Sequence, residues 1–185
     1  YSDPPRVISR LGYREEGYGY TGGEWTHVYC VDVANGRVTQ ITNGPHSCSA
    51  PVWSPDGSRI AFVTNRSEDA VLKPYDQEIY IVTLADGAEA KLNTPRGPKA
   101  SPAWSPDGLR IAYFGHTKPE EIWSLTQRHV WCVSVDGGTA TDITPDLDRP
   151  VGDEILCDSI PSHTSNVGPV WTDDSKRLIF LVSDQ

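Results

Sequence analysis

The sequence predicts an all-β fold built from repeated units of four antiparallel strands. A segment that begins at Trp53, WSPDGSRIAFV, returns at Trp104 as WSPDGLRIAYF, 51 residues later. The same offset of 51 residues relates EIYIVTL at 78–84 to HVWCVSV at 129–135. A fixed period that carries several separate segments indicates a repeat architecture.

Each repeat contains four expected strands and two turns. The first strand ends at the tryptophan, and the turn S-P-D-G follows it, with residue types that favour a tight turn. The second strand, such as 58–65, is rich in β-branched and aromatic residues, and the third strand is 78–84 or its equivalent. Hairpin signals at Asn35-Gly36 and Asp86-Gly87 precede the fourth strand.

Such repeats are typical of β-propeller blades, which are four-stranded sheets stacked around a central channel. One blade cannot bury both of its faces alone, so Trp53, Trp104 and Trp171 are expected to pack between adjacent blades. A two-sheet sandwich is the alternative, but sandwich strands do not recur with one long period. Trp171 follows Trp104 by 67 residues, which indicates an insertion of about 16 residues.

The repeats divide the chain into about three and a half four-stranded antiparallel blades. We expect a partial blade at 1–46, blades at 47–97 and 98–147, an inserted connection at 148–166 and a partial blade at 167–185. The segments RVISRLGYRE and KRLIFLVSDQ are expected second strands near the two ends. Because propellers contain about 4–8 blades, the chain is expected to be part of a larger ring. A homodimeric ring of two copies remains an alternative.

Composition excludes several functional classes. The chain has 16 Lys and Arg against 25 Asp and Glu, and a net charge of −9 disfavours nucleic-acid binding. No stretch approaches the ~20 apolar residues of a membrane span. The four cysteines, Cys30, Cys48, Cys132 and Cys157, form no C-x-x-C pair. We expect them to be reduced, which favours a cytoplasmic protein.

No catalytic residue, cofactor or metal ligand is assigned. The chain contains no G-x-S-x-G nucleophile motif. Gly17–Gly22 matches G-x-G-x-x-G, but a strand rather than a helix follows, so nucleotide binding is disfavoured. His27 and His129 occupy equivalent repeat positions, which suggests structural roles, and His46 with Cys48 has no second pair of ligands.

The repeat W-S-P-D-G-x-[RK] resembles two groups of propellers. One belongs to the bacterial Tol translocation system, and the other is the N-terminal propeller of the prolyl oligopeptidase family. YREEGYGY at 13–20 and DITPDLDRPVGDE at 142–154 resemble the acylaminoacyl-peptidase propellers of that family. The resemblance implies a C-terminal α/β-hydrolase domain that carries a Ser-Asp-His triad as the partner of this chain. In that family the propeller screens access, so that short peptides reach the hydrolase site.

Three further segments are candidates for local function. Arg14, Glu15 and Glu16 are substrate-binding candidates, because a guanidinium and carboxylates could hold the ends of a peptide; a local ion pair is the alternative. Thr117–Glu120 resembles a helix-capping box and could begin one short helix, with an irregular loop as the alternative. The long insertion at 147–166 could contact the hydrolase domain.

Overall fold

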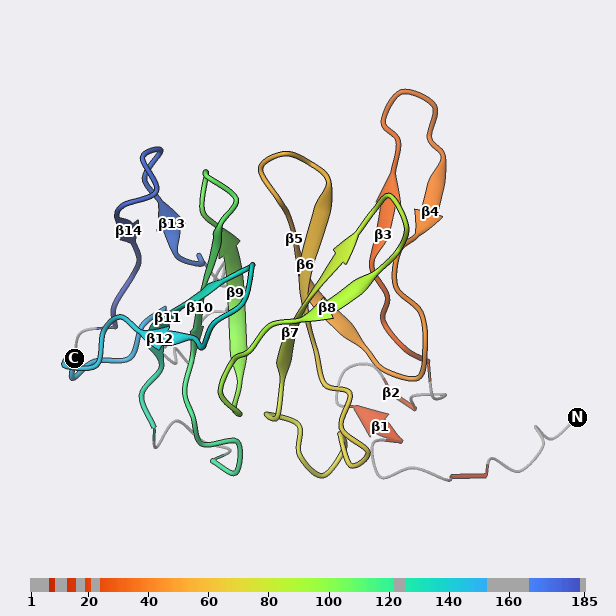
Figure 1. Ribbon diagram of the computed structural model, residues 1–185. Coiled ribbons are helices and arrows are strands. Elements are labelled where there is room, and N and C mark those ends of the chain that lie inside the picture. The colour runs from red at the N-terminus through yellow and green to blue at the C-terminus, as the bar shows by residue number, and fades with distance from the viewer. Residues whose placement is uncertain are drawn as a thin grey trace, which may run out of the picture.

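The computed structural model describes residues 7–8, 13–15, 19–20, 24–121, 126–152 and 167–183 (Figure 1). Within these ranges the regular secondary structure consists of β-strands alone, which confirms the all-β prediction. No helix in the described part is long and apolar enough to cross a membrane. Pro119 and Glu120 form a turn, and residues 122–125 of the expected short helix lie outside the described residues.

Two complete four-stranded antiparallel sheets form the centre of the molecule, and their strands follow chain order. The first comprises β5 (Cys48–Trp53), β6 (Arg59–Thr64), β7 (Glu78–Thr83) and β8 (Glu89–Lys91). The second comprises β9 (Lys99–Trp104), β10 (Arg110–Gly115), β11 (His129–Ser134) and β12 (Thr141–Asp142). Their registers agree, since Trp53 pairs with Ile60 and Trp104 with Ile111. The blades expected from the repeat are therefore present.

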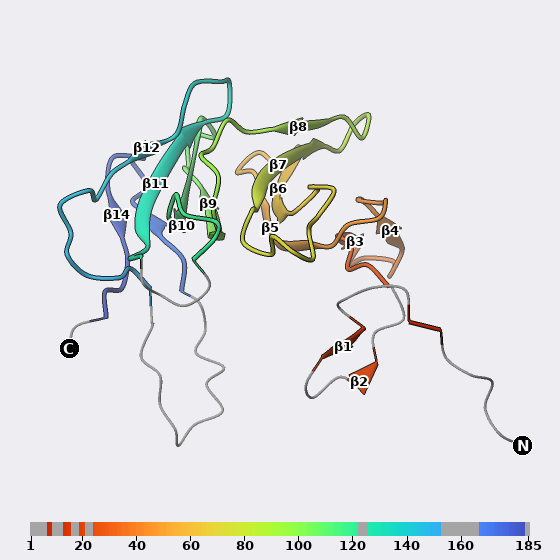
Figure 2. The ribbon, with the colours of Figure 1, turned by 90° about the horizontal axis from the view of Figure 1, so that it is seen from below.

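Two-stranded sheets flank the complete ones. β3 (Tyr29–Val31) pairs with β4 (Val38–Gln40), and β13 (Val170–Trp171) pairs with β14 (Leu178–Ile179). Figure 1 shows the sheets in chain order from β3–β4 to β13–β14, and Figure 2 shows the same order from below. An isolated bridge pairs Val151, in the segment after β12, with Val182, in the segment after β14.

The N-terminal segment differs from its expected role as the second strand of a blade. β1 (Arg14–Glu15) pairs with β2 (Gly19–Tyr20) in a sheet of its own. Val7 and Ile8 belong to no strand and are exposed. Residues 9–12 of the expected strand lie outside the described part of the chain.

Apolar clusters fill the spaces between successive sheets, as stacking of blades requires. The largest cluster lies between the two complete sheets and contains Ala61, Val63, Ile79, Ile81, Leu92, Trp104, Ile111, Tyr113, Val133 and Ala140. Val28 joins Phe62 and Val82 in the cluster on the β3–β4 side, and Phe114 joins Val130 and Val151 on the β13–β14 side. Each complete sheet therefore buries both of its faces against neighbours.

The first strand of each complete sheet contains a β-bulge at the same repeat position. Ala50 and Ser101 have φ of 48° and 51°, and the pairing register shifts there in both sheets. A proline follows in each case and cannot donate a ladder hydrogen bond. The bulges bend β5 and β9, which contact each other directly as the inner strands of adjacent blades.

Candidate functional site

The two S-P-D-G turns and the equivalent T-D-D-S turn at 172–175 form the same hydrogen-bond network. In the first turn the Ser54 hydroxyl donates to Asp56 at 2.6 Å and accepts from the Arg59 amide at 2.9 Å. Ser105 and Thr172 repeat this arrangement in the other two turns. The donated hydroxyl hydrogen bonds lower the pKa of the turn aspartates, which are Asp56, Asp107 and Asp174. Each turn therefore carries an ionised carboxylate that fixes its geometry.

A tryptophan and an arginine join the two complete sheets. The Trp104 indole Nε1 donates to the Val52 carbonyl of β5 at 3.3 Å. The Arg59 guanidinium lies over the Trp104 ring, 4.9 Å from its centroid, and donates to the Gly108 carbonyl at 3.4 Å. Trp104 is 8% exposed. A cation–π contact and an indole hydrogen bond thus join the β9–β12 sheet to the β5–β8 sheet.

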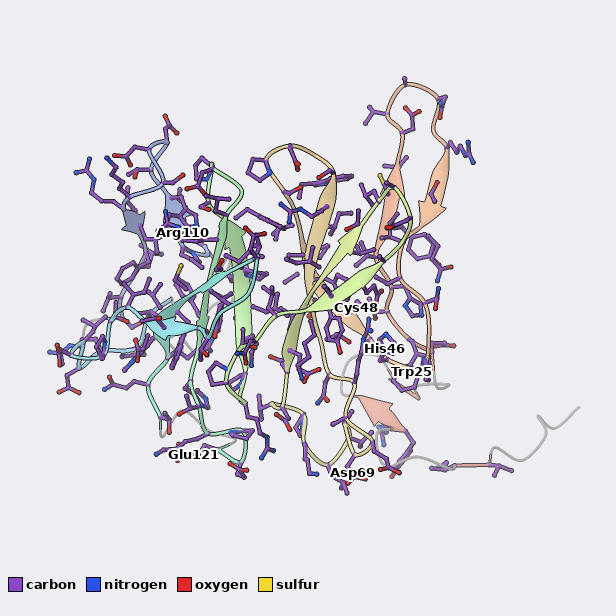
Figure 3. All side chains as sticks on the ribbon, viewed as in Figure 1. Trp25, His46, Cys48, Asp69, Arg110 and Glu121 are labelled. Atoms are coloured by element: carbon purple, nitrogen blue, oxygen red, sulfur yellow. The ribbon has the colours of Figure 1, made fainter. Side chains whose placement is uncertain are left out.

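The next junction repeats this geometry with equivalent residues. Trp171 Nε1 donates to the Ala103 carbonyl at 3.1 Å, and the Arg110 guanidinium lies 4.9 Å from the Trp171 ring centroid. Arg110 also donates to the carbonyl of Ser175, the residue that corresponds to Gly108. Figure 3 labels Arg110 on the side of the β9–β12 sheet that faces β13. The insertion of about 16 residues between the repeats therefore leaves the junction unchanged.

Trp53 departs from the expected packing between blades. Trp104 is 8% exposed, whereas Trp53 is 51% exposed. To be buried as Trp104 is, its indole would need a carbonyl from the first strand and a guanidinium from the second strand of the preceding sheet. In the part of the chain that the structure describes, that sheet consists of β3 and β4, which correspond to outer strands. The tryptophan is exposed because the other half of its junction is absent from the described residues.

The inner strands of three successive sheets line an open hollow of about 540 Å³. Its walls contain small and uncharged residues at matching repeat positions: Ala50 and Pro51 in β5, Ser101 and Pro102 in β9, and Gly168 and Pro169 before β13. Inner strands line the central channel of a propeller. We therefore take this hollow as the candidate functional site, where a ligand would meet short side chains and backbone.

Lys99 is the charged residue of this wall, and its ammonium group is fully engaged. Lys99 is 5% exposed, and its Nζ donates to the carbonyls of Gln77, Pro95 and Gly97 at 2.6, 2.7 and 3.0 Å. Burial lowers the pKa of Lys99 to about 8, so the group is still mainly protonated at neutral pH. An ammonium with three carbonyl acceptors has used all of its donors. Lys99 therefore stabilises the strand end and offers no proton to a ligand.

A second hollow, of about 550 Å³, lies at the opposite end of the sheets from the S-P-D-G turns. Trp25, His46 and the loop 65–72 line it, and Figure 3 shows Trp25 beside His46 with Asp69 on the loop. Asn65 holds this loop by donating to the Lys73 carbonyl at 2.6 Å. Burial and the nearby Arg66 lower the pKa of His46, which keeps its ring neutral at pH 7.

Two of the three residues proposed to bind a peptide, Arg14 and Glu15, belong to a short strand near the N-terminus. Arg14 and Glu15 form β1, opposite Tyr20 and Gly19, and the Arg14 side chain is exposed. Glu16 lies outside the described residues, as do most of Gly17–Gly22, Cys157 and most of the insertion at 148–166. The inner-strand wall was not foreseen from sequence, although the small residue and proline before each repeat tryptophan are its signal.

Two of the described histidines, His27 and His129, each lie close to a side-chain oxygen atom of a neighbouring residue. His129 Nδ1 lies 2.6 Å from the Asp142 carboxylate, and His27 lies 3.4 Å from the Thr42 hydroxyl. Across the described ranges no group of three or more His, Cys, Asp or Glu residues could hold a metal ion. Cys48, two residues from His46, is 2% exposed within the apolar cluster.

These features define a propeller of repeated Trp–Arg junctions around a small-residue channel wall. Residues 18–185 match the PD40 family, described as the TolB beta propeller domain. The match covers most of the chain, so the chain belongs to this family.

Curated relatives include a peptidase and a translocation protein. The chain is 30% identical over 98% of its length to the uncharacterized peptidase YuxL of Bacillus subtilis, and it covers 27% of that protein. It is 36% identical over 44% of its length to the Tol-Pal system protein TolB of Alcanivorax borkumensis, and it covers 18% of that protein. The chain thus spans about a quarter or less of these relatives.

Solved structures support the fold. An oligogalacturonate lyase in complex with manganese matches with a TM-score of 0.58 and 16% identity, over 82% of this chain and 36% of that one. A putative TolB from Agrobacterium tumefaciens matches with a TM-score of 0.52 and 20% identity, over 63% of this chain and 40% of that one. At such identities the likeness concerns the fold and not the activity.

Proposed function

We propose that this chain is the non-catalytic propeller portion of an oligopeptidase-like or acylaminoacyl-peptidase-like serine hydrolase. Here it screens short peptide substrates and docks the α/β-hydrolase domain. The observation that carries the proposal is the 30% identity to a peptidase along 98% of the chain. Because the chain covers 27% of that relative, the peptidase has ample length for a separate catalytic domain.

The inner-strand wall suits a screening role. Ser101, Pro102 and their repeat equivalents present neither a free charge nor a large side chain to the hollow. The charge of Lys99 is directed into backbone carbonyls. On this proposal the channel lined by this wall is too narrow for a folded protein. Its short, uncharged side chains discriminate little between the sequences of the peptides that pass. Short peptides of varied composition are the substrates that such a filter admits.

The catalytic residues, on this proposal, belong to the hydrolase domain, and the propeller needs no cofactor. A nucleophile elbow would supply the serine. Cys30, Cys48 and Cys132 are free thiols, which supports a reducing compartment such as the cytoplasm as the location.

The test is to read the gene beyond the codon for Gln185 and to assay the longer polypeptide. We expect an α/β segment with G-x-S-x-G, and hydrolysis of a chromogenic acyl-amino-acid substrate that is lost when its serine becomes alanine. The 185-residue chain serves as the matched control and should give no turnover. A longer polypeptide without the elbow, or turnover by the 185-residue chain that depends on one of its serines, would overturn the proposal.

A protein-binding propeller of the Tol translocation type is the second candidate. The family match and the 36% identity to TolB over 82 residues favour it. The same gene reading separates the two candidates, because a translocation propeller carries no hydrolase elbow. In that case the longer polypeptide should lack hydrolase activity and bind a protein partner through one face of the ring.

A further inference from the structure

The chain contains two Asn-Gly pairs, Asn35-Gly36 and Asn43-Gly44. At such a pair the backbone nitrogen of the glycine can attack the side-chain carbonyl carbon of the asparagine. Glycine favours this reaction because it has no Cβ to obstruct the approach and its backbone adopts many conformations. The attack requires a side-chain amide that is free to turn and a glycine N–H without an acceptor. The two pairs differ in both respects.

Hydrogen bonds fix Asn35 and Gly36 in the hairpin between β3 and β4. The Asn35 side chain donates from Nδ2 to the Asp32 carboxylate at 2.7 Å and accepts at Oδ1 from the Arg37 amide at 2.9 Å. The Gly36 N–H donates to the Asp32 carbonyl at 2.7 Å. These hydrogen bonds oppose both the rotation of the side chain and the deprotonation of the nitrogen that the attack requires.

The second pair, Asn43-Gly44, lies in the connection between β4 and β5, where both residues are exposed. Among the described residues nothing forms a hydrogen bond with the Asn43 side chain or with the Gly44 N–H. The chain is anchored on either side of the pair instead, since the amides of Ile41 and Cys48 donate to carbonyls of the segment before β3 at 2.8 and 2.7 Å. Both reacting groups are therefore free within a bend whose ends are fixed.

The conformation of this bend favours glycine at position 44. Gly44 has a φ of 104°, a backbone conformation that residues with a side chain rarely adopt. The His46 ring packs against the Gly44 backbone, so a Cβ at this position would lie 2.8 Å from His46 Cε1 and the ring would have to shift. The bend therefore keeps next to Asn43 the residue type that makes its side chain reactive.

We propose that Asn43 is a site of spontaneous deamidation and that the hairpin turn protects Asn35 from the same reaction. Hydroxide removes the proton of the Gly44 N–H, and the nitrogen attacks Cγ of Asn43. A new C–N bond closes a succinimide ring, the bond from Cγ to the side-chain nitrogen breaks, and ammonia leaves with a proton from water. Water then opens the ring at either carbonyl, which gives aspartate or isoaspartate.

The product carries a negative charge where the unmodified chain carries a neutral amide. Pro45 and His46, which follow the pair, line the hollow of about 550 Å³, so the new carboxylate lies at the edge of that hollow. Isoaspartate also places the former side-chain carbon in the backbone, which lengthens the bend. The reaction needs no other domain of the protein, because the reacting groups belong to Asn43 and Gly44 and to water.

The first experiment incubates the whole chain in mildly alkaline buffer and follows each asparagine by peptide mass mapping. Trypsin cleaves after Arg37, so Asn35 and Asn43 fall in separate peptides, 15–37 and 38–59. Asn43 should deamidate at least roughly tenfold faster than Asn35, because the hydrogen bonds of the turn oppose reaction at Asn35 alone. In guanidinium chloride, which unfolds the turn, the two rates should become similar. Equal rates in the native chain, an unreactive Asn43, or a difference that persists in denaturant would overturn the proposal.

The second experiment uses variants and follows the formation of a more acidic species by isoelectric focusing. Asn43→Gln should abolish the acidic species, because glutamine would have to close a larger ring, and the matched control Asn35→Gln should leave its formation unchanged. Asp32→Ala alters an exposed residue and removes the carboxylate that holds Asn35, so mass mapping should show the Asn35 rate rising towards that of Asn43. An acidic species that survives in Asn43→Gln contradicts the proposal, and so does an Asn35 rate that Asp32→Ala leaves unchanged.

Discussion

Trp53 and Trp104 begin the same five-residue motif and occupy the same place in their sheets, but their surroundings differ. Trp104 lies under the Arg59 guanidinium and donates to the Val52 carbonyl. Trp53 has no equivalent neighbours in the described part of the chain and is half exposed. The comparison teaches that each repeat supplies the tryptophan of one junction, while the arginine and the carbonyl of that junction come from the preceding sheet. Burial of the tryptophan then depends on which sheet precedes it.

The largest expected effect comes from removing the two tryptophans in turn. Trp104→Ala should lower the free energy of unfolding by about 3–5 kcal/mol, because it empties a packed site and leaves the Val52 carbonyl without its donor. Trp53→Ala should cost less than about 1 kcal/mol, because half of the side chain already faces solvent. Urea unfolding at low protein concentration measures both. Equal losses would show that the two sites are packed alike.

A smaller effect is expected for the junction arginines. Arg110→Ala removes a cation–π contact and a hydrogen bond to the Ser175 carbonyl, and should cost about 1–2 kcal/mol. Arg177 is the equivalent arginine after Trp171, and Arg177→Ala should change stability by less than about 0.5 kcal/mol, because that residue is exposed. The comparison uses the same urea titrations. Arg110→Lys controls for charge, and a full rescue by lysine would mean that the planar stacking contributes nothing.

The smallest effect concerns the pH dependence of the turns. Hydrogen bonds from Ser105 and the Leu109 amide lower the pKa of Asp107. A carboxyl group whose pKa falls on folding contributes stability above its unfolded pKa of about 3.9, and this contribution is lost as the pH falls through the folded value. Asp107→Asn should therefore flatten the dependence of unfolding free energy on pH below about 4.

Asp174→Asn should flatten the same profile, because its turn has the same hydroxyl and amide donors. Glu68→Gln controls for the loss of a surface charge. Denaturant unfolding at a series of acidic pH values gives the profiles. A profile that Asp107→Asn leaves as steep as the wild type would contradict the role given to the turn carboxylates.

Sequence alone could predict the strands and their register, because the 51-residue offset brings each Trp opposite the same aliphatic position. The role of Arg59 and Arg110 could also have been predicted, since an arginine recurs six residues after each repeat tryptophan. The channel wall has a similar signal in the prolines at 51, 102 and 169.

Other features depend on contacts between distant segments and could not be read from the pattern. The exposure of Trp53 depends on whether an inner strand lies beside it. Ala50 and Ser101 have positive φ because they lie at the β-bulges of β5 and β9. Neither residue type favours that conformation by itself. The three carbonyls around Lys99 come from residues spread over 77–97, and they meet only after the chain has turned between two sheets.

Each junction between sheets takes its arginine and its carbonyl from one sheet and its tryptophan from the next. This arrangement affects how such chains can change in evolution. Every unit carries one arginine–carbonyl face and one tryptophan face, so any unit fits any neighbour of the same kind. Duplication or loss of one 51-residue segment leaves no mismatched partner behind, and the spacing of 67 residues before Trp171 shows that a connection can lengthen without disturbing the fit. Selection can therefore vary the number of repeats and the length of their loops without changing the Trp–Arg junction between neighbouring sheets.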